Sequence, residues 1–92
     1  MFPGGTKAYG KFLEKNLRWP TQDDIQGRVI VSFIVEKDGS LTNFKVERSL
    51  GKDCDNEALR VLRKFPKWIP GMKNGKPVRV KYMVPINFTI SA

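Results

Sequence analysis

The sequence of 92 residues contains no histidine and only one cysteine, Cys54. Without histidine the chain cannot build a Ser-His-Asp or Cys-His catalytic arrangement, and it has no imidazole ligand for a metal ion. A single cysteine allows neither an intrachain disulfide nor a cysteine-rich zinc site. It also leaves the redox compartment open, because a lone thiol is compatible with either side of a membrane. We therefore expect no enzyme, no metal site and no cofactor.

Long apolar runs and acidic residues are also scarce. No apolar run approaches the roughly 20 residues that cross a bilayer, and the opening Met1-Phe2-Pro3-Gly4-Gly5 lacks the basic start and apolar stretch of a signal peptide. Asp and Glu number 9 against 17 Lys and Arg, which gives a net charge of +8. Such a charge attracts nucleic acid, anionic lipid, acidic glycans or an acidic protein without distinguishing between them. At this length we expect a single domain, residues 1–92, with one core.

Hydrophobic periodicity predicts five elements in the order α-β-β-α-β. Helical spacing runs from Thr6, the expected N-cap, to about Leu17, and again from Asp55 to Phe65, with acidic Asp53, Asp55 and Glu57 in the first turn of that helix. Period-two alternation runs from Arg28 to Lys37, from Leu41 to about Ser49, and from Val78 to Ile90. Lys37-Asp38-Gly39-Ser40 is expected to form a tight hairpin turn, and residues 68–77 a turn-rich connection.

The alternation of apolar and polar residues in all three strands predicts an antiparallel sheet with one covered face. We expect an α+β fold: a three-stranded antiparallel sheet in the spatial order 2-1-3, with both helices packed on one face. Pro85 supports an edge position for the last strand, because proline cannot donate to the ladder and occurs on edges or at bulges. The third strand then has a free edge, which either is merely blunted by Arg79, Lys81 and Pro85 or accepts a peptide by strand addition.

Other motifs favour structural roles. Gly71 to Lys76 has the glycines and lysine of a phosphate-binding loop, but its spacing is one residue short and a strand follows it. Cys54 has acidic neighbours and no base, which favours a structural thiol over a nucleophile. Trp19 and Trp68 each lie beside a proline at the end of an element, and we expect them to pack over the edge of the core.

Several pieces of the chain together resemble the TonB C-terminal domain, in a form similar to Bacteroidetes members. They occur in order and at compatible spacing over nearly the whole chain: Trp19-Pro20, Ile25-Gln26-Gly27-Arg28-Val29, Phe33 to Gly39, Val46 to Ser49, Asp55 with Ala58-Leu59, Trp68-Ile69-Pro70-Gly71, Gly75-Lys76-Pro77-Val78 and Val84-Pro85-Ile86-Asn87-Phe88. Trp19 stands where the family usually has tyrosine. The stretch from Pro20 to Gly27 is about three residues shorter than in familiar members, roughly one helical turn.

The resemblance implies a periplasmic domain excised from a longer protein, which would be anchored in the inner membrane by a segment outside this chain and energised there by ExbB/ExbD. Such a domain grips the Ton box of TonB-dependent outer-membrane receptors by strand addition and transmits force for the import of siderophores, vitamin B12 or glycans. The implied partner-binding residues are Asn16, Leu17, Arg18, Trp19, Pro20, Arg79, Lys81, Met83, Pro85, Asn87 and Thr89. A homodimer joined edge to edge is a further expectation.

Two alternatives remain open at the level of the sequence. The same domain also occurs appended to membrane peptidases of the beta-lactam-sensor type and to other envelope proteins, where it would bind a different periplasmic partner. A basic nucleic-acid-binding module would account for the charge of +8 and the two tryptophans. However, the aromatic residues do not interleave with the basic ones on one predicted strand face, so no nucleic-acid partner is expected.

Overall fold

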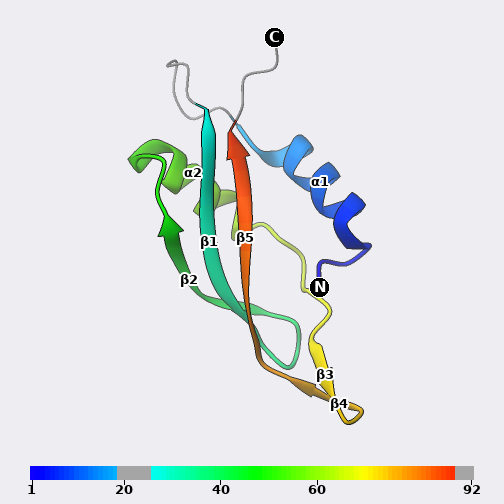
Figure 1. Ribbon diagram of the computed structural model, residues 1–92. Coiled ribbons are helices and arrows are strands. Elements are labelled where there is room, and N and C mark those ends of the chain that lie inside the picture. The colour runs from blue at the N-terminus through cyan, green and yellow to red at the C-terminus, as the bar shows by residue number, and fades with distance from the viewer. Residues whose placement is uncertain (19–25, 89–92) are drawn as a thin grey trace.

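A computed structural model describes residues 1–18 and 26–88 (Figure 1). The helices are α1 (Gly5–Asn16) and α2 (Lys52–Leu62), and the strands are β1 (Gly27–Val35), β2 (Leu41–Arg48), β3 (Gly71–Lys73), β4 (Lys76–Val78) and β5 (Val80–Phe88). These are the two helices of the described residues, and neither is long and apolar enough to cross a membrane.

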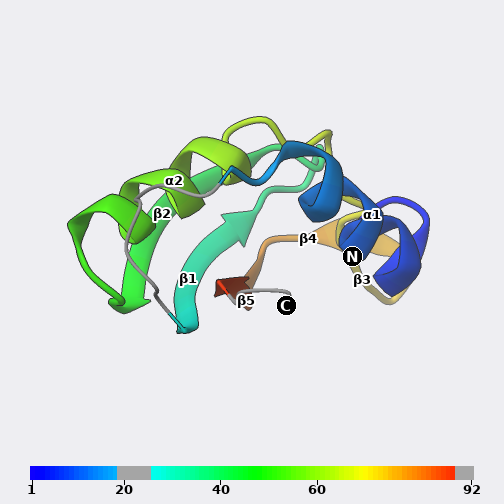
Figure 2. The same ribbon diagram turned by 90° about the horizontal axis from the view of Figure 1, so that it is seen from above.

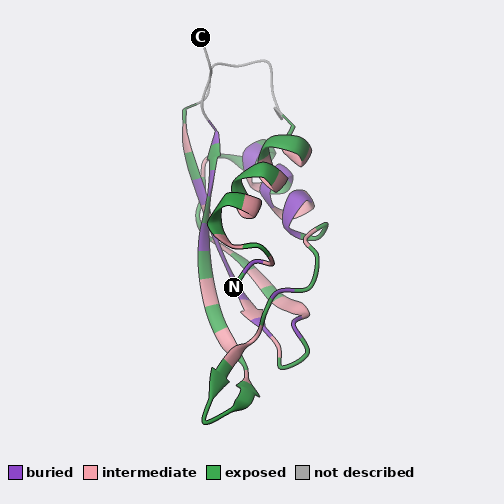
Figure 3. Cartoon of the chain, turned by 90° about the vertical axis from the view of Figure 1, so that its right-hand side faces the viewer, coloured by how far each residue is buried: buried purple, intermediate pink, exposed green. Residues whose placement is uncertain are grey.

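The main sheet has the predicted topology. Its strand order is β2-β1-β5 with antiparallel neighbours, which corresponds to the expected order 2-1-3. Both helices lie on the same side of this sheet, as Figure 3 shows with the sheet nearly edge-on. The turn after β1 also forms as expected, because Gly39 adopts φ 88° and the Glu36 N–H donates to the Ser40 carbonyl oxygen at 2.8 Å. The α+β fold class is thus confirmed.

The core lies between the sheet and the helices. On β1 the alternating residues Val29, Val31, Phe33 and Val35 are buried, and on β5 Val84, Ile86 and Phe88 are buried. Helix α2 adds Cys54, Ala58, Val61 and Leu62 to the buried residues. Phe44 and Val46 of β2 are half-buried against the core, on the side that the alternation predicted.

An aromatic cluster forms part of the core. Trp68 is only 5% exposed and meets the rings of Phe2, Phe33 and Tyr82 at centroid distances of 5.8, 5.0 and 5.3 Å. This confirms a packing role for Trp68. Phe2 precedes every element of secondary structure, yet it is 7% exposed and also contacts Tyr9, Phe12 and Phe65. The segment before α1 is therefore part of the core.

Some boundaries differ from the predictions. Thr6 is not the N-cap of the first helix: Gly4 is, with φ 85°, and the Gly5 N–H donates to the Phe2 carbonyl oxygen at 2.9 Å. The second helix begins at Lys52 and ends at Leu62, so Glu57 lies beyond its first turn, where only Asp53 and Asp55 remain. Phe65 follows the helix but still packs on the core.

The connection between α2 and β5 contains a hairpin that the prediction missed. Strands β3 and β4 pair antiparallel, so Val78 belongs to β4 and the last strand begins only at Val80. Asn74 and Gly75 join them with φ values of 52° and 76°. Positive φ at both central residues is the geometry of a type I′ hairpin turn, for which Asn-Gly is a strong sequence signal. The hairpin projects from the lower end of the molecule in Figure 1.

Candidate functional site: the outer edge of the sheet

Strand β5 forms a long, regular edge. It pairs with β1 in an uninterrupted register from Gly27–Phe88 to Val35–Val80. Within residues 1–18 and 26–88, no strand pairs with its other side. Lys81, Met83, Pro85 and Asn87, four of the predicted partner-binding residues, are exposed along this strand, and Met83 is 57% exposed. The structure thus brings these four residues together on one strand at the sheet's edge.

The orientation of the backbone groups follows from Pro85. Proline has no N–H, so the pair Ile30–Pro85 cannot exchange the two hydrogen bonds of a hydrogen-bonded pair. Because hydrogen-bonded and non-hydrogen-bonded pairs alternate along an antiparallel ladder, Lys81, Met83 and Asn87 also direct their N–H and C=O groups away from β1. These groups are the ones that an added strand would pair with.

The opposite edge of the sheet is less regular. The pairing of β2 with β1 has register shifts between Ile30 and Val31 and between Ser32 and Ile34, and Asn43 adopts φ 57°. Bulges and charged residues such as Lys45 and Arg48 are common means of blunting an edge. Of the two edges, β5 is therefore the one suited to strand addition.

An apolar groove runs beside the β5 edge. Figures 1 and 2 both show α1 lying beyond β5, on the side away from β1. The space between them has a volume of about 620 Å³ and is lined by Phe2, Gly5, Thr6, Tyr9, Tyr82 and Val84, together with Met1, Trp68 and Pro85. This volume lies within the range of ligand-binding pockets.

The Tyr9 hydroxyl closes one stretch of the edge. It donates to the Pro85 carbonyl oxygen at 3.0 Å. Burial raises the pKa of Tyr9 to about 12, so the phenol stays protonated and remains a donor over the physiological pH range. Pro85 therefore offers no donor and an already occupied acceptor, whereas Lys81 and Met83 keep both groups directed outward.

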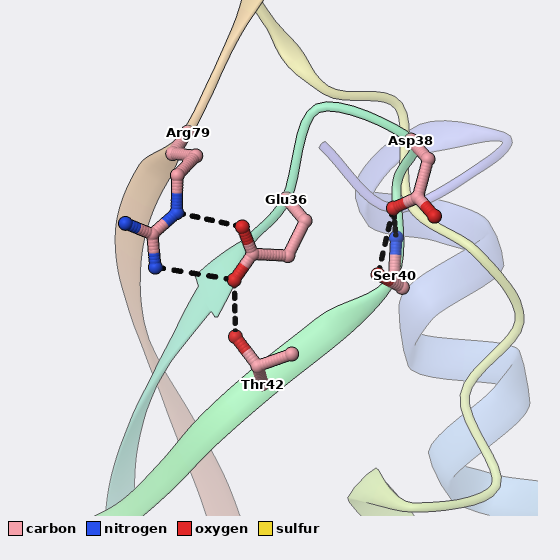
Figure 4. A network of polar contacts seen from close by, with 5 residues as sticks. All are labelled: Glu36, Asp38, Ser40, Thr42 and Arg79. Carbon is pink, nitrogen blue, oxygen red and sulfur yellow. Dashed lines mark hydrogen bonds and ion pairs between the residues drawn. The ribbon is translucent and has the colours of Figure 1, made fainter.

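Arg79 is engaged within the fold. It lies exposed between β4 and β5, and its Nε and Nη2 atoms contact the Glu36 carboxylate at 2.6 and 3.2 Å (Figure 4). Hydrogen bonds from Arg79 and Thr42 hold the pKa of Glu36 below its usual value. This bidentate pair ties the start of β5 to the end of β1.

Asn16 ends α1, and Leu17 and Arg18 follow it; Asn16 and Leu17 are half-buried, whereas Arg18 is exposed. Arg60 donates to the Asn16 carbonyl oxygen at 2.8 Å and pairs with Glu57, whose carboxylate also accepts the backbone N–H of Arg18 at 2.6 Å. Burial alone would raise the pKa of Glu57, but the hydrogen bonds from Arg60 and Arg18 outweigh it and lower that pKa. Leu17 is half-buried against the core. The polar contacts of this segment thus fasten α1 to α2.

Trp19, Pro20 and Thr89, the other predicted partner-binding residues, lie outside the described residues. Conversely, the prediction missed Phe2 and Tyr9 as parts of the site. Tyr9 could be recognised only as a member of the apolar face of its helix. Phe2 gave no signal beyond its aromatic character, because it precedes any periodic pattern.

Three further features of the described residues bear on chemistry: the thiol of Cys54, the grouping of possible metal ligands and the indole N–H of Trp68. Cys54 is 1% exposed, and burial together with the charges of Asp55 and Asp53 raises the pKa of its thiol, as suits the structural role that the sequence favours. In the ranges 1–18 and 26–88, the cysteine and acidic side chains form no group that could hold a metal ion. The Trp68 Nε1 donor is buried without a hydrogen-bond partner there, among aromatic rings that accept N–H groups only weakly.

Comparison with known proteins identifies the family. A family model described as the C-terminal region of the Gram-negative bacterial TonB protein matches residues 21–90, while no curated protein matches the chain. The matched range covers β1, β2, α2 and β5, which carry the sheet order and the free edge described above. The chain therefore belongs to the TonB C-terminal family, whose non-catalytic domains act in the periplasm of Gram-negative bacteria in energy transduction and interact with outer-membrane receptors.

Proposed function

We propose that the outer edge of β5 binds the Ton box of an outer-membrane receptor by adding it to the sheet as a further strand. The observation that supports this most directly is the regular edge of β5, whose residues Lys81, Met83 and Asn87 direct backbone donors and acceptors outward. The proposed contact surface comprises Arg79, Lys81, Met83, Pro85, Asn87 and Thr89, with Asn16, Leu17, Arg18, Trp19 and Pro20 contributing from the end of α1 and the segment after it.

Strand addition suits the transmission of force. A peptide that is pulled along its length while paired with β5 loads several backbone hydrogen bonds together. In the full-length protein, the pull would reach this domain through a segment that precedes it and is energised by ExbB/ExbD in the inner membrane. The net charge of +8 favours rapid encounter with acidic surfaces and receptors, an effect that decreases as ionic strength rises.

The proposal can be tested with isotope-labelled protein and synthetic peptides that carry the Ton boxes of receptors from the same organism. We expect the largest amide shifts at Lys81 and Met83, and small shifts at Lys45 on the opposite edge. The substitution Met83→Pro removes one outward N–H at an edge position, where proline is tolerated. Met83→Ala is its matched control, because it changes the same side chain and keeps the N–H.

We expect M83P to bind the peptide roughly three- to tenfold more weakly than M83A, which corresponds to the loss of one backbone hydrogen bond. Equal affinity of the two variants, or shifts confined to other parts of the molecule, would contradict strand addition at β5.

The same edge can pair with a second copy of the chain in an antiparallel arrangement, and we propose this homodimer as a competitor of the peptide. Light scattering at increasing protein concentration would detect it. If both use the β5 edge, saturating peptide converts the dimer to a monomer. A dimer that persists with peptide bound must use another surface.

A further inference from the structure

We propose that the groove between α1 and β5 selects peptides by accepting a bulky apolar side chain from the added strand. This inference rests on the strand addition proposed above and specifies which side chains the added peptide must carry. The groove is lined largely by apolar and aromatic residues, among them Phe2, Tyr9, Tyr82 and Val84. An apolar groove beside an edge with which none of the described strands pairs has the two components of peptide recognition by strand addition: backbone pairing for affinity and side-chain pockets for selectivity.

The geometry of a strand determines which peptide residues reach the groove. Side chains on one strand alternate between the two faces, and directly opposed residues on neighbouring strands point to the same face. Tyr82 and Val84 point toward the helices, where they line the groove. Peptide residues opposite these two therefore direct their side chains under α1.

The residues between them face the open side of the sheet. There the exposed Lys81 of β5 lies directly beside the added strand, because β5 is the edge strand of the order β2-β1-β5. The positive charge of Lys81 favours an acidic side chain at the neighbouring position of the peptide. The preferred peptide thus alternates bulky apolar residues with acidic or polar ones.

The Tyr9 to Pro85 hydrogen bond limits the register. Beyond Pro85 the edge resumes only at Asn87, because Pro85 has no N–H and its carbonyl oxygen accepts the Tyr9 hydroxyl. The outward groups of Lys81 and Met83 lie at the level of Tyr82 and Val84, which line the groove. The paired stretch of the peptide and the pocket for its side chains therefore coincide at residues 81–84.

Thr6 provides a substitution that alters the groove without touching the edge or the core. It lies exposed in the first turn of α1 and lines the groove. Thr6→Trp should fill the space under α1. Lys7→Trp is the matched control, because the neighbouring Lys7 is exposed on the same helix and does not line the groove. Thr6→Arg, which places a charge in the groove, is a second test variant in case T6W disturbs the fold.

The probe is a Ton-box peptide of the same organism and a series in which each of its positions is changed to alanine. We expect alanine to weaken binding at alternate positions, and T6W to weaken the parent peptide roughly tenfold to 100-fold relative to K7W, as expected for one large apolar side chain excluded from burial. Peptides that carry alanine at the positions facing the groove should bind T6W and K7W equally, because they have no bulky side chain for the groove to accept.

The two proposals fail in different ways. Strand addition is supported if peptides shift the β5 amides and bind M83P more weakly than M83A. Groove selection is refuted, even then, if T6W, T6R and K7W bind the peptide alike and the loss of affinity on alanine substitution does not alternate along the peptide. If no peptide reaches β5, the proposed function itself is refuted.

Discussion

Replacement of Phe2 by alanine tests whether the segment before α1 belongs to the core. Phe2 is 7% exposed and lies 5.3 to 5.8 Å, centroid to centroid, from the rings of Phe65, Tyr9 and Trp68. Truncation of a buried phenylalanine costs about 3–5 kcal/mol. Because Phe2 lies close to the N-terminal end, the segment can detach and relieve part of the cavity, so we expect the lower value, about 3 kcal/mol.

Such a loss is large for this domain. Proteins of this size unfold with a free energy of about 5–15 kcal/mol, and each kcal/mol shifts the melting temperature by about 4–8 °C. F2A should therefore melt at least about 12 °C below the parent protein in a calorimetric or circular-dichroism scan. In a Trp19→Phe background, the emission of Trp68 should also shift to the red, because Phe2 no longer covers that ring.

Met72→Ala is the control for the loss of an exposed apolar side chain. Met72 lies on the projecting hairpin and is 61% exposed, so its truncation should change the stability by less than about 0.5 kcal/mol. If F2A behaved like M72A, Phe2 would not be a core residue, and the lining of the groove by the N-terminal segment would have to be abandoned.

Three further predictions concern other contacts. The pKa of Glu57 is lowered in the fold, so its charge stabilises the protein above the unfolded pKa of about 4.5, and this contribution is lost as the pH falls. At neutral pH, Glu57→Gln should therefore unfold at a lower urea concentration than the parent protein. The difference between the two urea midpoints should shrink when the pH is lowered below that pKa. Gly39→Ala should destabilise the protein by more than about 1 kcal/mol in urea unfolding, because Gly39 has φ 88° and an added Cβ would lie 2.3 Å from the Trp68 carbonyl oxygen; stability equal to the parent would refute the turn geometry. Cys54 should react with a thiol reagent only as fast as the protein unfolds, and rapid labelling of the native protein would contradict its burial.

Local pattern was sufficient for most of the fold. The alternation from Val29 to Val35 and from Val80 to Phe88 depends only on nearest neighbours in the chain, and it predicted both the strands and their buried faces. Pro85 marked the edge strand because its missing N–H is a property of the residue itself. The β3–β4 hairpin was missed although Asn74-Gly75 carries its signal, since strands of three residues are too short to show a period.

The sequence by itself thus determined the types of the main elements, the order of the sheet and the strand that has a free edge. The tertiary structure decided what lies beside that edge. The Tyr9 to Pro85 hydrogen bond joins residues 76 positions apart, and the Arg18 to Glu57 bond joins residues 39 positions apart. Hydrophobic periodicity along the chain cannot predict such pairs, because they depend on how α1 and the segment before it pack on the sheet. The edge at β5 could therefore be predicted from the sequence pattern, whereas the groove beside it depends on the tertiary packing of α1.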